Sequence, residues 1–136
     1  MLDSRQALTT WLENNTNLNA LSTTIVQEDE FTEETSRPAI VLTYDGSDEE
    51  PGTLFRNERW DFWLVAESND YYTLGRLAAV LRKDLDRFTL PHVVNAESTI
   101  LRVKWVGEGP AVFDTTYRVH TQVQSYIAIV FDVEGA

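Results

Sequence analysis

The sequence offers few residues whose types and spacing could support catalysis or bind a metal ion. Its two histidines, His92 and His120, lie 28 residues apart, and neither has the spacing of a metal site or of a catalytic triad. A general base also needs convergent polar partners, which the sequence does not indicate. We therefore predict a loop position for His92, the polar side of a strand for His120, and a catalytic role for neither.

Four acids near the middle of the chain are the other candidate ligands. Asp45, Asp48, Glu49 and Glu50 carry the carboxylates that calcium prefers, but their spacing is not that of an EF-hand loop. Runs of charge among turn-forming residues more often make solvated loops. The segment 45–52 is therefore predicted to be the long tip of a hairpin, without a bound metal ion.

Cofactor and disulfide chemistry are not indicated either. The sequence contains no cysteine, which excludes disulfides, thiol nucleophiles and cysteine-ligated metal centres. Gly107 and Gly109 lack the third glycine and the strand-to-helix context of a dinucleotide-binding loop, so they predict a turn. The sequence thus predicts no catalytic site, no cofactor and no enzymatic activity.

The negative charge of the chain is concentrated in one stretch. The formal net charge is −11, and residues 28–50 hold nine of the 22 acids with a single base, Arg37, which gives that stretch −8. An acidic chain without a basic stripe repels a polyphosphate, which argues against a nucleic-acid-binding protein of the ordinary kind. The sequence also lacks an apolar run of about 18 residues and the features of a signal peptide. We expect a soluble cytoplasmic protein that does not enter a membrane.

A tryptophan-rich strand at residues 59–67 is the clearest structural pattern. Its side chains alternate with period two, as in a half-buried strand. One face is wholly apolar and carries Trp60, Phe62, Leu64 and Ala66. The opposite face carries Asp61, Trp63, Val65 and Glu67, and we expect its apolar middle to be covered as well. Because aromatic residues on mixed faces are enriched at protein interfaces, Trp63 is a candidate interaction residue.

An amphipathic helix follows this strand, after a turn at residues 68–70. Its apolar residues recur at helical spacing along residues 74–88 and form one stripe. The stripe consists of Leu74, Leu77, Ala78, Leu81, Leu85 and Phe88. Pro91 prevents the helix from continuing. A stripe of this kind needs a sheet to pack on, so we predict that this helix covers one face of a sheet of at least four strands.

The remaining pattern completes one α+β domain over residues 1–136. Further elements are predicted at residues 4–13 (helix) and at 23–27, 39–44, 54–66, 99–106 and 115–131 (strands). The strand at 54–66 contains most of the tryptophan-rich segment. In the strand at 99–106, Leu101, Val103 and Trp105 are predicted to share one side. The order α-β-β-β-α-β-β indicates a mostly antiparallel sheet with helices packed on it.

Two of these strands have features that point beyond a simple monomer. The first half of the strand at 54–66 is polar, with Arg56, Asn57, Glu58 and Arg59, and we expect it to project from the core. The strand at 115–131 would exceed about 50 Å if straight, so it should bend, bulge or reach beyond its own core. Exposed strand edges readily pair with other chains, so we predict self-association.

The element order and several apolar stretches resemble the tail terminator, or tail completion, proteins of tailed bacteriophages. The resemblance is carried by Arg37-Pro38-Ala39-Ile40-Val41-Leu42, Trp60-Asp61-Phe62-Trp63-Leu64-Val65, the helix at 74–88 and Tyr126-Ile127-Ala128-Ile129-Val130. It implies a structural protein of the virion, assembled in the host cytoplasm, whose subunits form a ring, typically a hexamer. Such a ring caps the tail tube, ends its polymerisation and faces the head connector protein. The resemblance implies no cofactor, no catalysis, and DNA that passes through without specific binding.

Within that interpretation, five residues join Trp63 as candidates for interaction. Asp48, Glu49 and Glu50 are expected to face the lumen, where carboxylates would repel the DNA phosphates, or to meet a basic surface on the tube or connector. A solvated hairpin tip is the alternative for these acids. Arg56 and Arg59 are candidate contacts across the ring.

Two alternative functions stay open at this point. One is a head–tail connector or neck protein of the same particle, which ring stoichiometry and co-purifying partners would distinguish. The other is a small α+β enzyme or ligand-binding protein, which requires an enclosed pocket with convergent polar groups.

Overall fold

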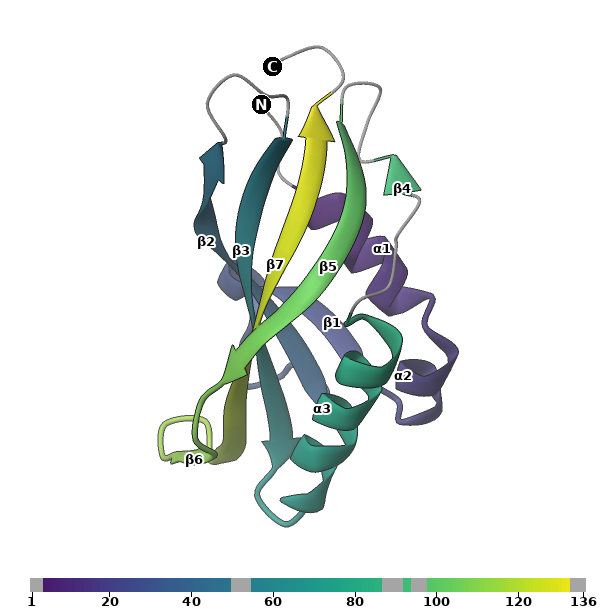
Figure 1. Ribbon diagram of the computed structural model, residues 1–136. Helices are drawn as coiled ribbons and strands as arrows, with labels where there is room; N and C mark the ends of the chain where they lie inside the picture. The colour runs from purple at the N-terminus through teal and green to yellow at the C-terminus, as the bar shows by residue number, and fades with distance from the viewer. Residues whose placement is uncertain (1–3, 50–54, 87–91, 94–97, 133–136) are drawn as a thin grey trace.

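A computed structural model describes residues 4–49, 55–86, 92–93 and 98–132 of the chain (Figure 1). Within these residues it has one twisted sheet of seven strands, and α1, α2 and α3 lie on one of its faces. The helices are α1 (Arg5–Glu13), α2 (Thr16–Ala20), the short 3₁₀ helix η1 (Glu28–Glu30) and α3 (Tyr72–Asp84). The strands are β1 (Thr24–Gln27), β2 (Ala39–Glu49), β3 (Phe55–Glu67), β4 (His92–Val93), β5 (Ser98–Glu108), β6 (Val112–Asp114) and β7 (Val119–Asp132). The predicted α+β class is confirmed.

The sheet has the strand order β1-β2-β3-β7-β5-β4, and β6 pairs with part of β7. Only β1 and β2 run parallel among the described strands, so the sheet is mostly antiparallel, as predicted. β3 and β7 lie at its centre and pair from Phe55↔Phe131 to Glu67↔Val119 without a register shift. This continuous pairing decides which side chains share each face, because directly opposite residues point to the same side.

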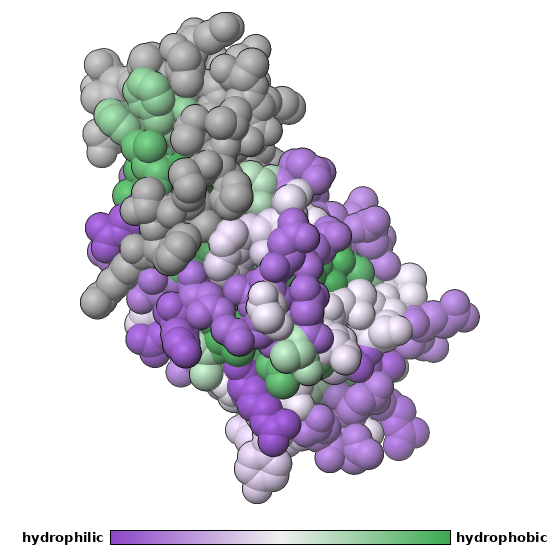
Figure 2. All heavy atoms as spheres, turned by 90° about the vertical axis from the view of Figure 1, so that its right-hand side faces the viewer, coloured by the Kyte–Doolittle hydropathy of each residue, from purple (hydrophilic) through white to green (hydrophobic). Residues whose placement is uncertain are grey.

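The core lies between the helices and one face of the sheet. Trp60, Phe62, Leu64 and Ala66 of β3 are all buried there, which confirms the predicted apolar face. The stripe of α3 packs on them through the buried residues Leu74, Leu77 and Leu81 and the following Leu85. Burial of each such side chain contributes about 1.5–3 kcal/mol. Viewed from the side of the helices, the surface is mostly hydrophilic with small separate apolar patches (Figure 2).

The helix α3 is shorter than predicted at its C-terminal end. It ends at Asp84, where Leu85 donates its backbone N–H to Leu81 O at 2.8 Å. The next residue, Asp86, accepts the backbone N–H of Trp105 at 2.7 Å and so ties this end of the helix to β5. Phe88, predicted as the last residue of the stripe, lies outside the described residues.

The segment 45–52 was predicted as a loop, and this was wrong for residues 45–49. β2 continues to Glu49 through a bulge between Tyr44 and Ser47, where Gly46 has a φ of +97°. Glycine adopts this conformation without the steric cost of a Cβ, so the bulge lets β2 resume pairing with β3. A turn-rich composition therefore marked a bulge inside a strand.

The expectation that the polar first half of β3 projects from the core was also wrong. Arg56 and Glu58 are 1% and 0% exposed. The Glu58 carboxylate accepts the backbone N–H of Ser4 and the indole N–H of Trp60, both at 3.0 Å. Its second oxygen lies 2.7 Å from Arg56 Nη1. Burial is tolerated because the two opposite charges are adjacent and the carboxylate is hydrogen-bonded.

The last two long strands also depart from the expected pattern. In β5 a bulge between Ile100 and Arg102 turns Ile100 and Val103 toward the core and leaves Leu101 at 37% exposure, so the predicted grouping of Leu101 with Val103 was wrong. β7 begins at Val119 and not at residue 115. The preceding residues form β6 and a turn in which Asp114 Oδ1 accepts the backbone N–H groups of two residues, Thr116 and Tyr117.

Replacing Leu81 by alanine is expected to lower the free energy of unfolding by about 2–5 kcal/mol, because the side chain is fully buried in the centre of the stripe and its loss leaves a cavity. Chemical denaturation monitored by circular dichroism would measure this. Arg76→Ala, on the exposed side of the same helix, is the control and should change stability by less than about 0.5 kcal/mol. Equal midpoints for L81A and the wild type would contradict this packing.

Replacing Glu58 by glutamine is expected to lower the free energy of unfolding by about 3 kcal/mol, because it keeps the shape of the side chain but removes the charge beside the buried Arg56 guanidinium. The double variant E58Q/R56M removes both charges and should recover part of the loss. A single variant as stable as the wild type in urea denaturation would show that the ion pair does not hold this part of the sheet.

A candidate interaction surface on the open face of the sheet

The second face of the sheet, which α1, α2 and α3 do not cover, is called here the open face. Alternation along the central strands places on it the odd-numbered residues of β3 and β7, in register with β2 and β5. Trp63 lies opposite Val123, and Asp61 lies opposite Ser125, whose hydroxyl donates to Asp61 Oδ1 at 2.7 Å. This hydrogen-bonded pair separates two halves of the open face that differ in charge.

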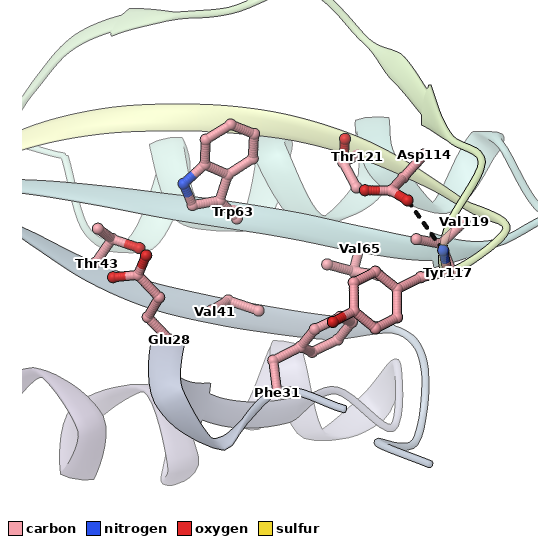
Figure 3. Close-up of a pocket in the computed structure, with 10 residues that line it drawn as sticks. All are labelled: Glu28, Phe31, Val41, Thr43, Trp63, Val65, Asp114, Tyr117, Val119 and Thr121. Atoms are coloured by element: carbon pink, nitrogen blue, oxygen red, sulfur yellow. Dashed lines mark hydrogen bonds between the residues drawn. The ribbon is translucent and has the colours of Figure 1, made fainter. Parts of the chain in front are cut away.

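One half of the open face contains a groove of about 320 Å³ (Figure 3). Its floor is formed by the buried valines Val41, Val65 and Val119. Its lining also includes Trp63, Phe31, Tyr117, Thr43, Thr121, Glu28 and Asp114. Glu28 and Asp114 stand at opposite ends of the groove (Figure 3). The groove thus combines an apolar floor, aromatic walls and carboxylates.

Two segments far apart in sequence build the aromatic wall of the groove. Phe31 follows η1, which begins with a capping box in which Glu30 Oε1 accepts the backbone N–H of Gln27 at 3.1 Å. Tyr117 is held by the turn at Asp114. The two rings meet edge to face with centroids 5.1 Å apart. They cover the small apolar cluster beneath, so the predicted covering of this face is confirmed at Val65 but was wrong for Trp63, which is 41% exposed.

The other half of the open face carries a basic row, defined as Arg59, Arg102 and Lys104. Their positions follow from the register, since Ile127 pairs with Arg59 on one side and Lys104 on the other, and Ile129 pairs with Arg102. Arg59 is ion-paired with Asp48 of β2. Arg102 and Lys104 are exposed, and neither makes an ion pair with another residue in the described part of the chain.

The residues predicted for interaction occupy three different environments. Trp63 lies on the groove, and Asp48 and Arg59 pair with each other at the surface, with side chains 64% and 49% exposed. Arg56 was expected to contact a neighbouring subunit, but it is buried beside Glu58 and has no surface to offer. Glu50 and the side chain of Glu49 lie outside the described residues.

Several residues of this surface were not singled out from the sequence. Glu28, Phe31 and Tyr117 gave no signal, because the segments that bring them together are more than 80 residues apart and share no motif. Arg102 and Lys104 had a weak signal, since they alternate with apolar residues in a predicted strand. Their role at a surface depends on what lies beside them in the sheet.

Elsewhere in the structure, the histidine and the buried tyrosine that could take part in acid–base chemistry make structural contacts. His120 Nε2 lies 3.1 Å from the carbonyl oxygen of Ser68, and its ring packs between Tyr71 and Phe113. Burial, with Asp86 adding to it, raises the pKa of the Tyr126 phenol above its ordinary value, so this group keeps its proton. The described residues contain no group of three or more histidines or acids that could hold a metal ion. No helix in the described part of the chain is long and apolar enough to span a membrane.

Comparison with known proteins gives a likeness of fold. No protein-family model matches the sequence, and no curated protein matches it significantly. Among solved structures, the chain is similar to a chain of the virion of a native gene transfer agent particle, with a TM-score of 0.66 and 12% sequence identity over 90% of each chain. The two chains therefore share a fold along nearly their whole lengths.

Proposed function

We propose that this protein is a structural subunit of a tailed-phage or phage-like particle, and that it acts as a tail terminator. In this role its subunits form a ring, expected to be a hexamer, that caps the tail tube, ends its polymerisation and presents a surface to the head connector protein. The observation that carries the proposal is the likeness of fold to a virion chain over 90% of both chains. The element order that resembles tail terminators points in the same direction.

The open face supplies the kind of surface that such an assembly needs. It carries the exposed apolar residues Phe55 and Trp63 together with the basic row. Monomeric proteins seldom expose large contiguous apolar patches, and exposed aromatic and arginine side chains are typical of the energetically important centre of an interface. The open face is therefore the candidate contact surface of the subunit.

The alternatives differ in what they require of this surface. A head–tail connector or neck protein of the same particle would use a similar fold but bind the head side. A small enzyme needs convergent polar groups in an enclosed pocket. The groove instead has a valine floor and carboxylates at opposite ends (Figure 3), which favours docking of a partner side chain.

The acidic end of β2 has a second role within this proposal. Asp48 and Glu49 are the last residues of β2, and with Glu50, which follows them in the sequence, they belong to the stretch that carries −8 in each copy. Like charges of this density in several copies repel one another at close packing unless counterions or basic partners intervene. We place these acids toward the lumen of the ring, where they keep the duplex from adhering, or against a basic surface of the tube or connector.

The purified protein is expected to appear as ring-shaped density at one end of isolated tail tubes in negative-stain images, and to stop further growth of the tubes. Binding along the whole tube or to the head alone would favour a connector. A protein that stays monomeric both alone and with tail tubes would end the ring proposal, whereas a free monomer that assembles only on tubes agrees with it.

Replacing Asp48, Glu49 and Glu50 together by asparagine, glutamine and glutamine is expected to impair head joining or DNA passage, because it removes three of the charges of the acidic stretch. Little change in the unfolding midpoint is expected, since the described side chain among the three, Asp48, is 64% exposed. Tail completion, head joining and DNA ejection assays would measure this. Triple-variant particles that behave as wild type in all three assays would leave a solvated strand end as the better explanation.

A further inference from the structure

The two halves of the open face have opposite and unused charge. Arg102 and Lys104 are exposed beside Ile127 and Ile129, in a chain whose net charge is −11. In the groove, Glu28 is exposed and makes no ion pair with any residue in the described ranges. These charges therefore remain available to a partner molecule.

The groove has the chemistry to hold a basic side chain. Its valine floor can pack against the aliphatic stem of an arginine or lysine, and its carboxylates can pair with the charged head. The rings of Trp63 and Tyr117 add faces on which a guanidinium can stack. The chain already uses such a contact, since the guanidinium carbon of Arg82 lies 3.9 Å from the ring centroid of Trp105.

We propose that the groove of one copy receives Arg102 and Lys104 of a second copy, in a head-to-tail contact. The occupant is a second copy because the complementary surface is present on the same chain. Arg59 contributes less, since Asp48 already pairs with it. Ile127 and Ile129, which lie beside the basic row, would then pack near Trp63 of the neighbour and exclude water from the charge pairs.

The twist of the sheet favours a head-to-tail contact. β7 and β5 turn strongly along their length, so the two ends of the open face point in different directions (Figure 1). A contact between two different patches repeats from copy to copy and closes as a ring when the rotation allows. Closure into a ring rests on the proposed function, whereas the pairing of groove and basic row does not.

Charge reversal tests the contact in solution. R102E/K104E is expected to raise the dissociation constant for self-association at least about tenfold in sedimentation experiments, on isolated protein or on tail tubes. R76E/K83E makes the same change of net charge on the exposed side of α3 and should have a smaller effect. E28K should also weaken association, and E28K combined with R102E/K104E should restore part of it, because the reversed charges again attract.

Cysteine crosslinking tests the geometry, and the absence of native cysteine makes the result specific. Thr121→Cys in the groove and Ile127→Cys beside the basic row retain the charges, and their six-residue separation along β7 is too long for a short bismaleimide to bridge within one copy. A mixture of T121C and I127C should give a crosslinked dimer with a short bismaleimide, whereas T121C mixed with R76C should not. The doubly substituted chain should give a ladder of multiples that ends at the ring number. A ladder that stops at the dimer would indicate a two-fold contact and overturn the proposal.

The outcomes separate this inference from the proposed function. If the wild type assembles on tail tubes but R102E/K104E behaves like R76E/K83E, the proposed contact is wrong and the tail-terminator proposal stands. If crosslinking finds the contact but neither the wild type nor any variant binds tubes, the contact stands and the tail-terminator proposal is wrong. A wild type that is monomeric alone and on tubes overturns both. Circular dichroism spectra and unfolding midpoints like those of the wild type establish that each variant is folded.

Discussion

Thirteen consecutive residue pairs join β3 to β7 without a register shift, and they determine both faces of the sheet at once. Because side chains alternate with period two, a slip by one residue would exchange the buried and exposed sets along both strands. Trp60, Phe62 and Leu64 face the helices only in the observed register, and Trp63 reaches the open face for the same reason. The core and the candidate interaction surface thus depend on one pairing.

A buried ionic network holds the N-terminal helix to this central pair of strands. Glu58 joins the backbone N–H at Ser4, the indole of Trp60 and the guanidinium of Arg56. The first N–H groups of a helix have no partner within it, so a carboxylate at this place satisfies a donor that would otherwise stay unpaired. Buried ion pairs add little stability compared with apolar residues of the same size. Because Ser4 directly precedes α1, its hydrogen bond to Glu58 ties the start of the helix to β3.

The open face shows how one sheet can serve two purposes. The half with the groove is partly covered by Phe31 and Tyr117, and these rings leave room for a side chain from another molecule. The half with the basic row is left uncovered and holds isoleucines between cations. Such a combination of apolar contact and complementary charge gives an interface both affinity and a defined orientation.

The sequence by itself determined the elements whose evidence is local. The period-two pattern of residues 59–67 and the helical stripe from Leu74 to Leu85 each report the burial of one face, and both agree with the structure. Local pattern also indicated that Trp63 differs from the other tryptophans, because polar neighbours share its face. From these elements followed the α+β class and the mostly antiparallel sheet.

The tertiary structure alone decided how those elements combine. The bulges at Gly46 and Leu101 depend on partner strands, so alternation in one strand could not reveal them. The burial of Arg56 and Glu58 depends on the position of α1, which the polar sequence of β3 does not encode. The groove and the basic row arise from segments that the sheet brings together over long sequence separations. Local periodicity records whether a side chain is buried, whereas register and coverage are set by residues that are distant in the chain.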